Sequence, residues 1–257
     1  MRYARGTYSI SPERDIPILR LVRNSKFITH PQVFEMMHLA GKEYSRDSFN
    51  WRMKRLEQAH FVGRCEGNFG RGELIYRITT AGLLQLEDHG CFAAVLNSTT
   101  EHLPPATQVH HALELNAIHL ALTRANLLAS WQSDVETASL NTISRAPLEK
   151  DFDAIVDVWN GQTMARFAVE YERTLKSARQ YERIRRNLQR DDRTGCVLYL
   201  TAGLEIAVHL CYELSGVGKR LAFATAPVFR EKLLETPVLV HPDQPQEIFR
   251  GLLRGVF

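Results

Sequence analysis

Cysteine is scarce in this sequence, and its few copies are scattered. No Cys-x-x-Cys pair occurs among Cys65, Cys91, Cys196 and Cys211, although pairs at that spacing are what structural zinc sites commonly use. The pattern therefore argues against a zinc site and against a disulfide framework. It predicts buried thiols instead.

Long hydrophobic runs and targeting signals are also missing. No uncharged apolar run approaches the ~18 residues of a membrane span. The basic start at Arg2 and Arg5 is not followed by the apolar segment of a signal peptide. We therefore expect a cytoplasmic protein that does not enter a membrane. A Gly-x-x-x-x-Gly-Lys-Ser/Thr phosphate loop is absent too, so we expect no nucleotide hydrolysis.

The composition that is present is that of an ordinary globular protein. Of the 257 residues, 44% are hydrophobic and 24% are charged, which leaves room for a core in one or two domains. The net charge of +3 is uneven, because residues 1–90 carry 14 Lys and Arg against 10 Asp and Glu, while the remainder carries 18 against 19. A basic N-terminal part points to an anionic partner, although so small a surplus also occurs on proteins that bind no nucleic acid.

Turn-forming residues mark a boundary between two domains. The segment 97–107 reads Asn-Ser-Thr-Thr-Glu-His-Leu-Pro-Pro-Ala-Thr, and its adjacent prolines fit neither a helix nor a central strand. We therefore predict a linker at 97–107 between a first domain at 1–96 and a second domain at 108–257.

The first domain has the element order of a winged helix-turn-helix. The predicted elements are helices that begin near Ser11, Thr29 and Ser45, strands at 61–65 and 74–78, and a closing helix that ends at Leu86. Glycines between the two strands supply the positive φ angles that a hairpin turn needs. Three short helices, a hairpin and another helix resemble a mainly α-helical winged helix-turn-helix domain.

The third predicted helix, at about 45–59, has a face suited to DNA. At 100° per residue, Met53 and Leu56 fall within about 40° of Phe49, and these three residues form the buried side. An exposed stripe of Asn, Arg and Lys suits base edges and phosphates in a major groove. The predicted DNA-binding residues are Arg46, Ser48, Asn50, Trp51, Lys54 and Arg55 on this helix and Arg71 at the hairpin tip. The alternative is a solvated helix face with a hairpin that contacts proteins.

The second domain has the element order of the restriction-endonuclease-like, PD-(D/E)xK, α/β core. The predicted elements are a helix at 108–128, strands at 131–136, 152–159 and 163–172, a helix at 174–190 and a strand at 196–200. Later elements that would extend the same α/β layer are a helix at 204–214, a strand at 221–225, and helices at 226–234 and 246–253.

Carboxylates stand where such a core holds its metal. Asp153 and Glu170 would meet on adjacent strands, and period-two alternation places Glu172 on the same face as Glu170. If the site is active, Asp153, Glu170 and Glu172 are the predicted Mg²⁺ ligands and catalytic carboxylates. Active nucleases have Lys where Glu172 stands, and Lys176 is the candidate replacement. The alternative is a structural cluster paired with arginines such as Arg173.

The helix after Glu172 carries a basic stripe. Cations recur at spacings of three and four, within an arc of about 80°: Lys176, Arg179, Arg183, Arg186 and Arg190. Nearly opposite lie the apolar residues Tyr181, Ile184 and Leu188. Such a row suits a phosphate backbone, and we predict DNA contacts from Lys176, Arg179, Arg183 and Arg186. The alternatives are pairing with Glu182 and simple solvation.

Several short motifs together resemble the replication-relaxation family of plasmids and mobile elements. They are the segments 111–118 (His-Ala-Leu-Glu-Leu-Asn-Ala-Ile), 153–154 (Asp-Ala) and 167–174 (Phe-Ala-Val-Glu-Tyr-Glu-Arg-Thr), together with Tyr181. The resemblance covers most of the chain. It implies a fold similar to PD-(D/E)xK nucleases with an acidic residue in the place of the Lys, as Glu172 is here.

The resemblance and the residues lead to one main expectation and two alternatives. We expect a DNA-binding accessory or regulatory protein of plasmid or mobile-element replication, transfer or transcription, with a degenerate nuclease-like domain. Its expected partners are double-stranded DNA and a second copy of the chain, and DNA binding needs no cofactor. The first alternative is an Mg²⁺-dependent DNA endonuclease that uses Asp153, Glu170 and Glu172. The second alternative is a protein-interaction adaptor.

Overall fold

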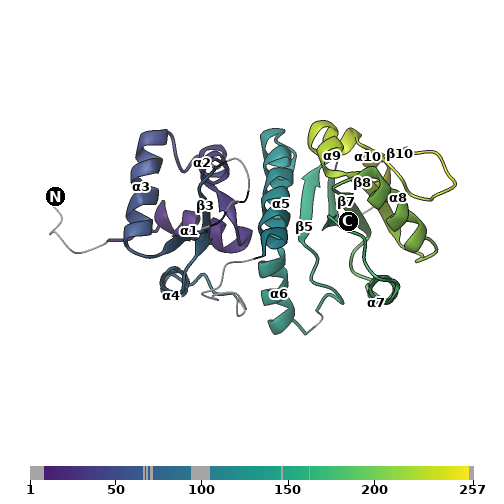
Figure 1. Ribbon diagram of the computed structural model, residues 1–257, viewed down its shortest axis with the longest axis horizontal. Coiled ribbons are helices and arrows are strands. Elements are labelled where there is room, and N and C mark those ends of the chain that lie inside the picture. The colour runs from purple at the N-terminus through teal and green to yellow at the C-terminus, as the bar shows by residue number, and fades with distance from the viewer. Residues whose placement is uncertain are drawn as a thin grey trace. The chain divides into compact units, whose positions relative to one another are not determined.

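The computed structural model describes residues 9–254 except 66, 68, 70, 71, 94–104, 146 and 162. The chain forms two compact units, residues 1–116 and 117–257, and the division falls within α5 (Ala106–Arg124) (Figure 1). Most of the predicted linker, the basic N-terminal start and Arg71 lie outside the described residues.

The first unit combines helices with a small antiparallel sheet. Its helices are α1 (Asp15–Ser25), α2 (His30–Leu39), α3 (Arg46–Gln58) and α4 (Thr80–Asp88), followed by the first part of α5. Its strands are β1 (Ile28–Thr29), β2 (Val62–Arg64) and β3 (Ile75–Ile78), in the order β1-β3-β2. The predicted helices and both predicted strands are present, and β1 is an addition.

Side-chain caps fix where three of these helices begin. The Oγ atoms of Thr29, Ser45 and Thr79 accept backbone N–H bonds at the starts of α2, α3 and α4, which satisfies donors that have no partner within the helix. The first helix begins later than predicted, because Ser11 opens a turn and accepts the backbone N–H of Asp15 before α1 starts.

The core of the first unit contains the predicted buried face of α3. Phe49, Met53 and Leu56 are all buried, as the helical periodicity predicts. The first part of α5 also packs here, since Val109 joins an apolar cluster with Phe27. Gly82 in α4 is required by packing, because a Cβ there would lie 2.1 Å from the carbonyl oxygen of Phe61.

The second unit contains a mixed five-stranded sheet. The strands are β4 (Leu128–Ser133), β5 (Ala154–Trp159), β6 (Met164–Glu172), β7 (Cys196–Thr201) and β8 (Arg220–Thr225), in sequence order across the sheet. The first three strands pair antiparallel, and β6, β7 and β8 pair parallel. Parallel neighbours need crossover connections, which are α7 (Ala178–Arg190) and α8 (Leu204–Glu213).

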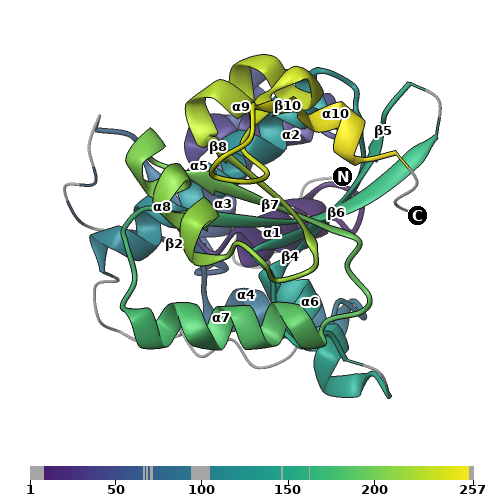
Figure 2. The ribbon, with the colours of Figure 1, turned by 90° about the vertical axis from the view of Figure 1, so that its right-hand side faces the viewer.

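Helices cover both faces of this sheet. Tyr181 of α7 and Leu210 of α8 share one apolar cluster with Tyr199 of β7. Figure 2 shows α7 and the pair α9 (Ala226–Lys232) and α10 (Phe249–Leu252) on opposite sides of the sheet. Phe167 of β6 packs edge-on against Phe249 at 5.0 Å between ring centroids. A 3₁₀ turn (Leu233–Glu235) and short strands β9 (Pro237–Val238) and β10 (Glu247–Ile248) join α9 to α10.

The predicted strand at 131–136 is wrong in its second half. The strand ends at Ser133, and α6 (Asp134–Ile143) follows it, so a helix separates the first two strands. The cause is a capping box: Ser133 and Glu136 exchange side-chain and backbone hydrogen bonds at the start of α6. Similarly, α5 ends earlier than predicted, and Asn126 beyond it takes a left-handed φ of 55°.

The mixed α/β class of the chain is confirmed. None of the described helices is long and apolar enough to cross a membrane. All four cysteines are free thiols, of which Cys196 and Cys211 are buried and Cys65 and Cys91 half-buried. The prediction of buried thiols is therefore confirmed for Cys196 and Cys211, whereas Cys65 and Cys91 are only half-buried.

Candidate functional site

One face of α3 presents polar and aromatic side chains to solvent. Asn50 and Lys54 are exposed, and Trp51 is 58% exposed. The guanidinium of Arg55, which is half-buried, lies 4.5 Å from the centroid of the Trp51 ring. Arg46 at the start of the helix is exposed and lies 4.7 Å above the Phe34 ring. Four of the predicted residues of α3 are therefore exposed, namely Arg46, Asn50, Trp51 and Lys54, whereas Ser48 and Arg55 are half-buried.

A hydrogen-bond network holds Asn50. His30, the first residue of α2, contacts Asn50 Oδ1 through Nε2 at 2.8 Å and the Tyr76 hydroxyl through Nδ1 at 3.1 Å. With Nε2 protonated, His30 donates to Asn50 and accepts from Tyr76, so both ring nitrogens are satisfied. The amide of Asn50 is thereby oriented on the outer surface of α3.

A buried cation holds α3 on the side that faces the core. This residue was not singled out by the sequence analysis. Arg52 is 5% exposed and forms ion pairs with Asp15 at 2.7 Å and Glu43 at 2.6 Å, both of which are fully buried. Burial opposes the charged form of Arg52, but the hydrogen bonds to Asp15 and Glu43 outweigh it and raise the pKa. The sequence signal that could have identified Arg52 was the position of a charged residue beside the apolar face of an amphipathic helix.

In the second unit, the sheet brings Asp153 and Glu170 together. The β5–β6 register pairs Ala154 with Val169, so one further step places Asp153 opposite Glu170. The Tyr171 backbone N–H donates to Asp153 Oδ2 at 2.8 Å. Both carboxylates line a cavity of about 420 Å³.

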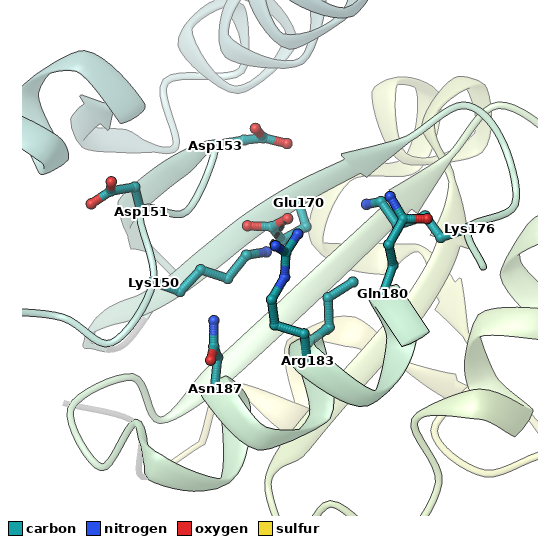
Figure 3. Close-up of a pocket in the computed structure, with 9 residues that line it drawn as sticks. Lys150, Asp151, Asp153, Glu170, Lys176, Gln180, Arg183 and Asn187 are labelled. Atoms are coloured by element: carbon teal, nitrogen blue, oxygen red, sulfur yellow. Dashed lines mark ion pairs between the residues drawn. The ribbon is translucent and has the colours of Figure 1, made fainter. Parts of the chain in front are cut away.

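The cavity is lined by charges of both signs. Its lining residues are Lys150, Asp151, Asp153, Glu170, Lys176, Gln180, Arg183, Ile184 and Asn187. Figure 3 shows the side chains of Lys150 and Arg183 extending towards the carboxylate of Glu170, whereas the carboxylate of Asp151 points away from it. Asp151 accepts a hydrogen bond from Asn141. Two cations therefore extend towards Glu170, and Asp153 lines the same cavity.

Two lysines pair with the two carboxylates of β6. Lys150 forms an ion pair with Glu170, and Lys176 forms one with Glu172. Glu172 is not among the cavity-lining residues. Lys150 was missed by sequence reasoning, which sought a cation only at or after residue 172. A lysine three residues before Asp153 was the available signal.

Burial changes the protonation of Glu170. Its pKa is raised to about 7, first by burial and then by the charges of Asp153 and Glu172, while Lys150 opposes the shift. Its Oε1 is buried and has no hydrogen-bond partner among the described residues. The Tyr199 hydroxyl on β7, the strand paired with β6, is also buried and has no hydrogen-bond partner among the described residues. Burial raises the pKa of Tyr199 well above its usual value.

A divalent cation would have two carboxylates here. Within the described part of the chain, no group of three or more His, Cys, Asp and Glu side chains is arranged to hold a metal ion, and Glu172 already pairs with Lys176. Asp153 and Glu170 nevertheless fit Mg²⁺, which commonly binds one or two carboxylates and keeps several waters. The orphaned Oε1 of Glu170 is a suitable ligand atom.

The outer face of α7 is basic, as the spacing predicts. Arg179, Arg183, Arg186 and Arg190 are exposed, and Tyr181, Ile184 and Leu188 on the opposite side are buried. Lys176 precedes the helix, which begins at Ala178 rather than near residue 174. One stripe residue, Arg186, has an exposed ion pair with Glu182 at 3.1 Å.

The comparison with protein families identifies a family for this chain. A family model described as replication-relaxation matches residues 19–198, which is more than half of the chain and includes α3, Asp153, Glu170 and α7. The comparisons with curated proteins and with solved structures found no match.

Proposed function

The chain belongs to the replication-relaxation family, and we propose that it is a DNA-binding accessory or regulatory protein of plasmid or mobile-element replication or transfer. In this proposal the first unit is a winged helix-turn-helix and α3 is its recognition helix. The observation that carries the proposal is the exposed face of α3, which contains Asn50, Trp51 and Lys54. The opposite face of the helix is buried in the core.

The chemistry of this face suits the major groove, which admits an α-helix. An Asn amide pairs with the N6 and N7 edge of adenine through one donor and one acceptor. The amide of Asn50 is already oriented by His30. Lys54 carries a charge that neutralises a phosphate whatever the sequence. Asn50 therefore reads sequence, and Lys54 adds affinity.

The second unit contributes contacts to the DNA backbone in this proposal. The row Arg179, Arg183 and Arg186 lies on the solvent side of α7, and guanidinium groups bind phosphates bidentately. We propose a PD-(D/E)xK-like fold without efficient catalysis for this unit. Winged-helix proteins commonly pair to read two half-sites, so a homodimer completes the proposal.

Binding isotherms on matched and mismatched duplexes test the recognition helix. Asn50→Ala is expected to reduce discrimination against a mismatched base by about 1–3 kcal/mol if the contact is bidentate. Lys54→Ala is expected to weaken all sequences alike. Unchanged affinity and discrimination in both variants would contradict the assignment of α3.

An Mg²⁺-dependent DNA endonuclease is the second candidate function. The observation that favours it is the cavity in which Asp153 and Glu170 meet with Lys150 nearby. Bound Mg²⁺ would activate a water and neutralise charge on the phosphate. Asp153 and Glu170 would hold the ion, and Lys150 would offset charge that develops on the phosphoryl oxygens.

Incubation of the purified protein with plasmid DNA separates the candidates. The samples contain EDTA, Mg²⁺ or Mn²⁺ and are scored for retarded mobility and for strand breaks. We expect retardation without breaks, because Glu172 puts a negative charge where the nuclease motif has Lys. Metal-dependent breaks that disappear in Asp153→Ala and Glu170→Ala would establish the endonuclease instead. The absence of both retarded mobility and strand breaks would favour a protein-interaction adaptor.

A further inference from the structure

Helix α8 has apolar side chains on two of its sides. The residues of its inner side are buried in the core of the second unit: Ile206, Ala207, Leu210 and Cys211. On its outer side, Leu204 is 57%, Val208 37% and Tyr212 55% exposed, and these three residues form an apolar row at a spacing of four. A surface helix normally places polar residues opposite its buried side. The apolar row is therefore not explained by the packing of the second unit, and exposed apolar surface of this kind marks interaction sites.

A row of ionisable residues runs beside the apolar row. Glu205, His209 and Glu213 each directly follow a member of the apolar row, so they lie about 100° further round the helix. The imidazole of His209 lies 3.9 Å from the carboxylate of Glu213. Arg185 of α7 donates a hydrogen bond to the Glu213 carbonyl oxygen, and its side chain remains 39% exposed. The ionisable row is therefore anionic at the start of α8 and has an accessible guanidinium beside its end.

We propose that the α8 helices of two copies of the chain pack against each other, antiparallel about a twofold axis at Val208. A twofold interface uses the same patch on both copies. Leu204 of one copy then meets Tyr212 of the other, because both lie four residues from the centre. The apolar row is thereby covered along its whole length. This inference rests on the homodimer of the proposed function and gives that homodimer a surface.

The charges beside the apolar row favour this occupant and this direction. In an antiparallel pair the same flank of both helices meets, so Glu205 of one copy lies beside the end of α8 in the other copy, where Arg185 is accessible. A parallel pair would instead bring Glu205 against Glu205, and like charges repel. Antiparallel helices also place the positive end of each macrodipole beside the negative end of the other. The outer surface of α8 is therefore complementary to itself in charge.

The size of α8 indicates a weak dimer. A helix of 10 residues is about 15 Å long, which is short for an interface of the standard size, roughly 800 Å² on each partner. We therefore expect dissociation in the micromolar range, as for other small interfaces. Two copies bound to neighbouring DNA half-sites would be at a high effective concentration, so a weak interface is sufficient there.

Sedimentation velocity without DNA tests the interface, at protein concentrations from about 1 to 200 µM, which bracket a weak dissociation constant. Val208→Asp places two carboxylates at the axis and is expected to weaken dimerisation by about 30-fold or more, as the loss of a central hot-spot residue does. The matched control is Leu84→Asp, at a leucine of α4 that is 55% exposed, and it is expected to dimerise as wild type does. Wild-type protein that stays monomeric, or a folded Val208→Asp variant that dimerises like wild type, would overturn the inference.

Oxidative cross-linking tests the direction of the helices. A residue on a twofold axis meets its own copy, so Val208→Cys is expected to give a disulfide-linked dimer with copper phenanthroline. Leu204→Cys is the matched variant, because antiparallel pairing separates its two copies by about 12 Å along the helices, which is beyond the reach of a disulfide. The wild-type chain measures the background from its own thiols. Efficient cross-linking of Leu204→Cys, or none of Val208→Cys, would overturn the antiparallel arrangement.

These measurements separate the failure of this inference from that of the proposed function. Wild-type protein that dimerises equally well with and without the α8 substitutions would overturn only the assignment of the surface. Wild-type protein that dimerises through α8 but retards no duplex would overturn the DNA-binding proposal and support the α8 interface.

Discussion

The buried ion pairs of Arg52 allow a sharp prediction about α3. Arg52→Met keeps an unbranched apolar stem but leaves Asp15 and Glu43 without their shared cation. Removing one partner of a buried ion pair commonly costs about 3–5 kcal/mol. Two interactions remain: Arg14 still pairs with Glu43 at 2.8 Å, and the Ser11 backbone N–H still donates to Asp15 at 2.9 Å. We therefore expect a loss of stability near the lower value, about 3 kcal/mol.

Hydrogen exchange at the backbone amides of α3 measures this loss, because it reports opening of the first unit even if the second stays folded. A loss of about 3 kcal/mol corresponds to a roughly 100-fold fall in protection, since about 1.4 kcal/mol is tenfold. Lys54→Ala on the exposed face of the same helix is the control, with an expected change within about 0.5 kcal/mol.

A second variant tests the physical reason for the loss. Combining Arg52→Met with Asp15→Asn and Glu43→Gln removes the stranded charges and is expected to recover part of the stability, because neutral amides are less costly to bury than unpaired carboxylates. A loss below about 1 kcal/mol in Arg52→Met would refute the reasoning, since it falls well under the cost of stranding a buried charge. The reasoning would also be refuted if the triple variant were less stable than Arg52→Met alone.

The remaining predictions concern the charges of the second unit. Replacing Arg179, Arg183 and Arg186 together by Gln is expected to flatten the salt dependence of DNA affinity by about 0.9 for each phosphate that these arginines neutralise, and an unaltered slope in the folded variant would show that they do not bind DNA. Glu170 has a pKa raised to about 7 in the folded chain, against an ordinary value of 4.5. Its contribution to stability is therefore complete below about pH 4.5 and is lost as the pH rises towards 7. Denaturation from pH 4 to 8 should show this loss in wild type and not in Glu170→Gln, and equal pH profiles would contradict it.

Local periodicity was sufficient for much of the fold. The spacing of Phe49, Met53 and Leu56 identified the buried side of α3, and the three-to-four spacing of arginines identified the exposed side of α7. Both patterns depend only on residues within a few turns of one helix. The capping box at Ser133 and Glu136 was an equally local signal. The strand predicted from the sequence nevertheless continues past Ser133, because the residues before it have a strand-like composition.

The tertiary structure alone decided which charges meet. Arg52 pairs with Asp15, 37 positions away, and Lys150 pairs with Glu170, 20 positions away. The sequence placed Asp153 and Glu170 on neighbouring strands, because antiparallel pairing gives a simple register, and the resemblance to the replication-relaxation family agreed. Lys150 stands three residues before Asp153 in the sequence, but it lies outside any periodic element, so local spacing did not indicate that it pairs with Glu170. An ion pair between distant residues depends on how separate elements pack, and local spacing carries no information about that packing.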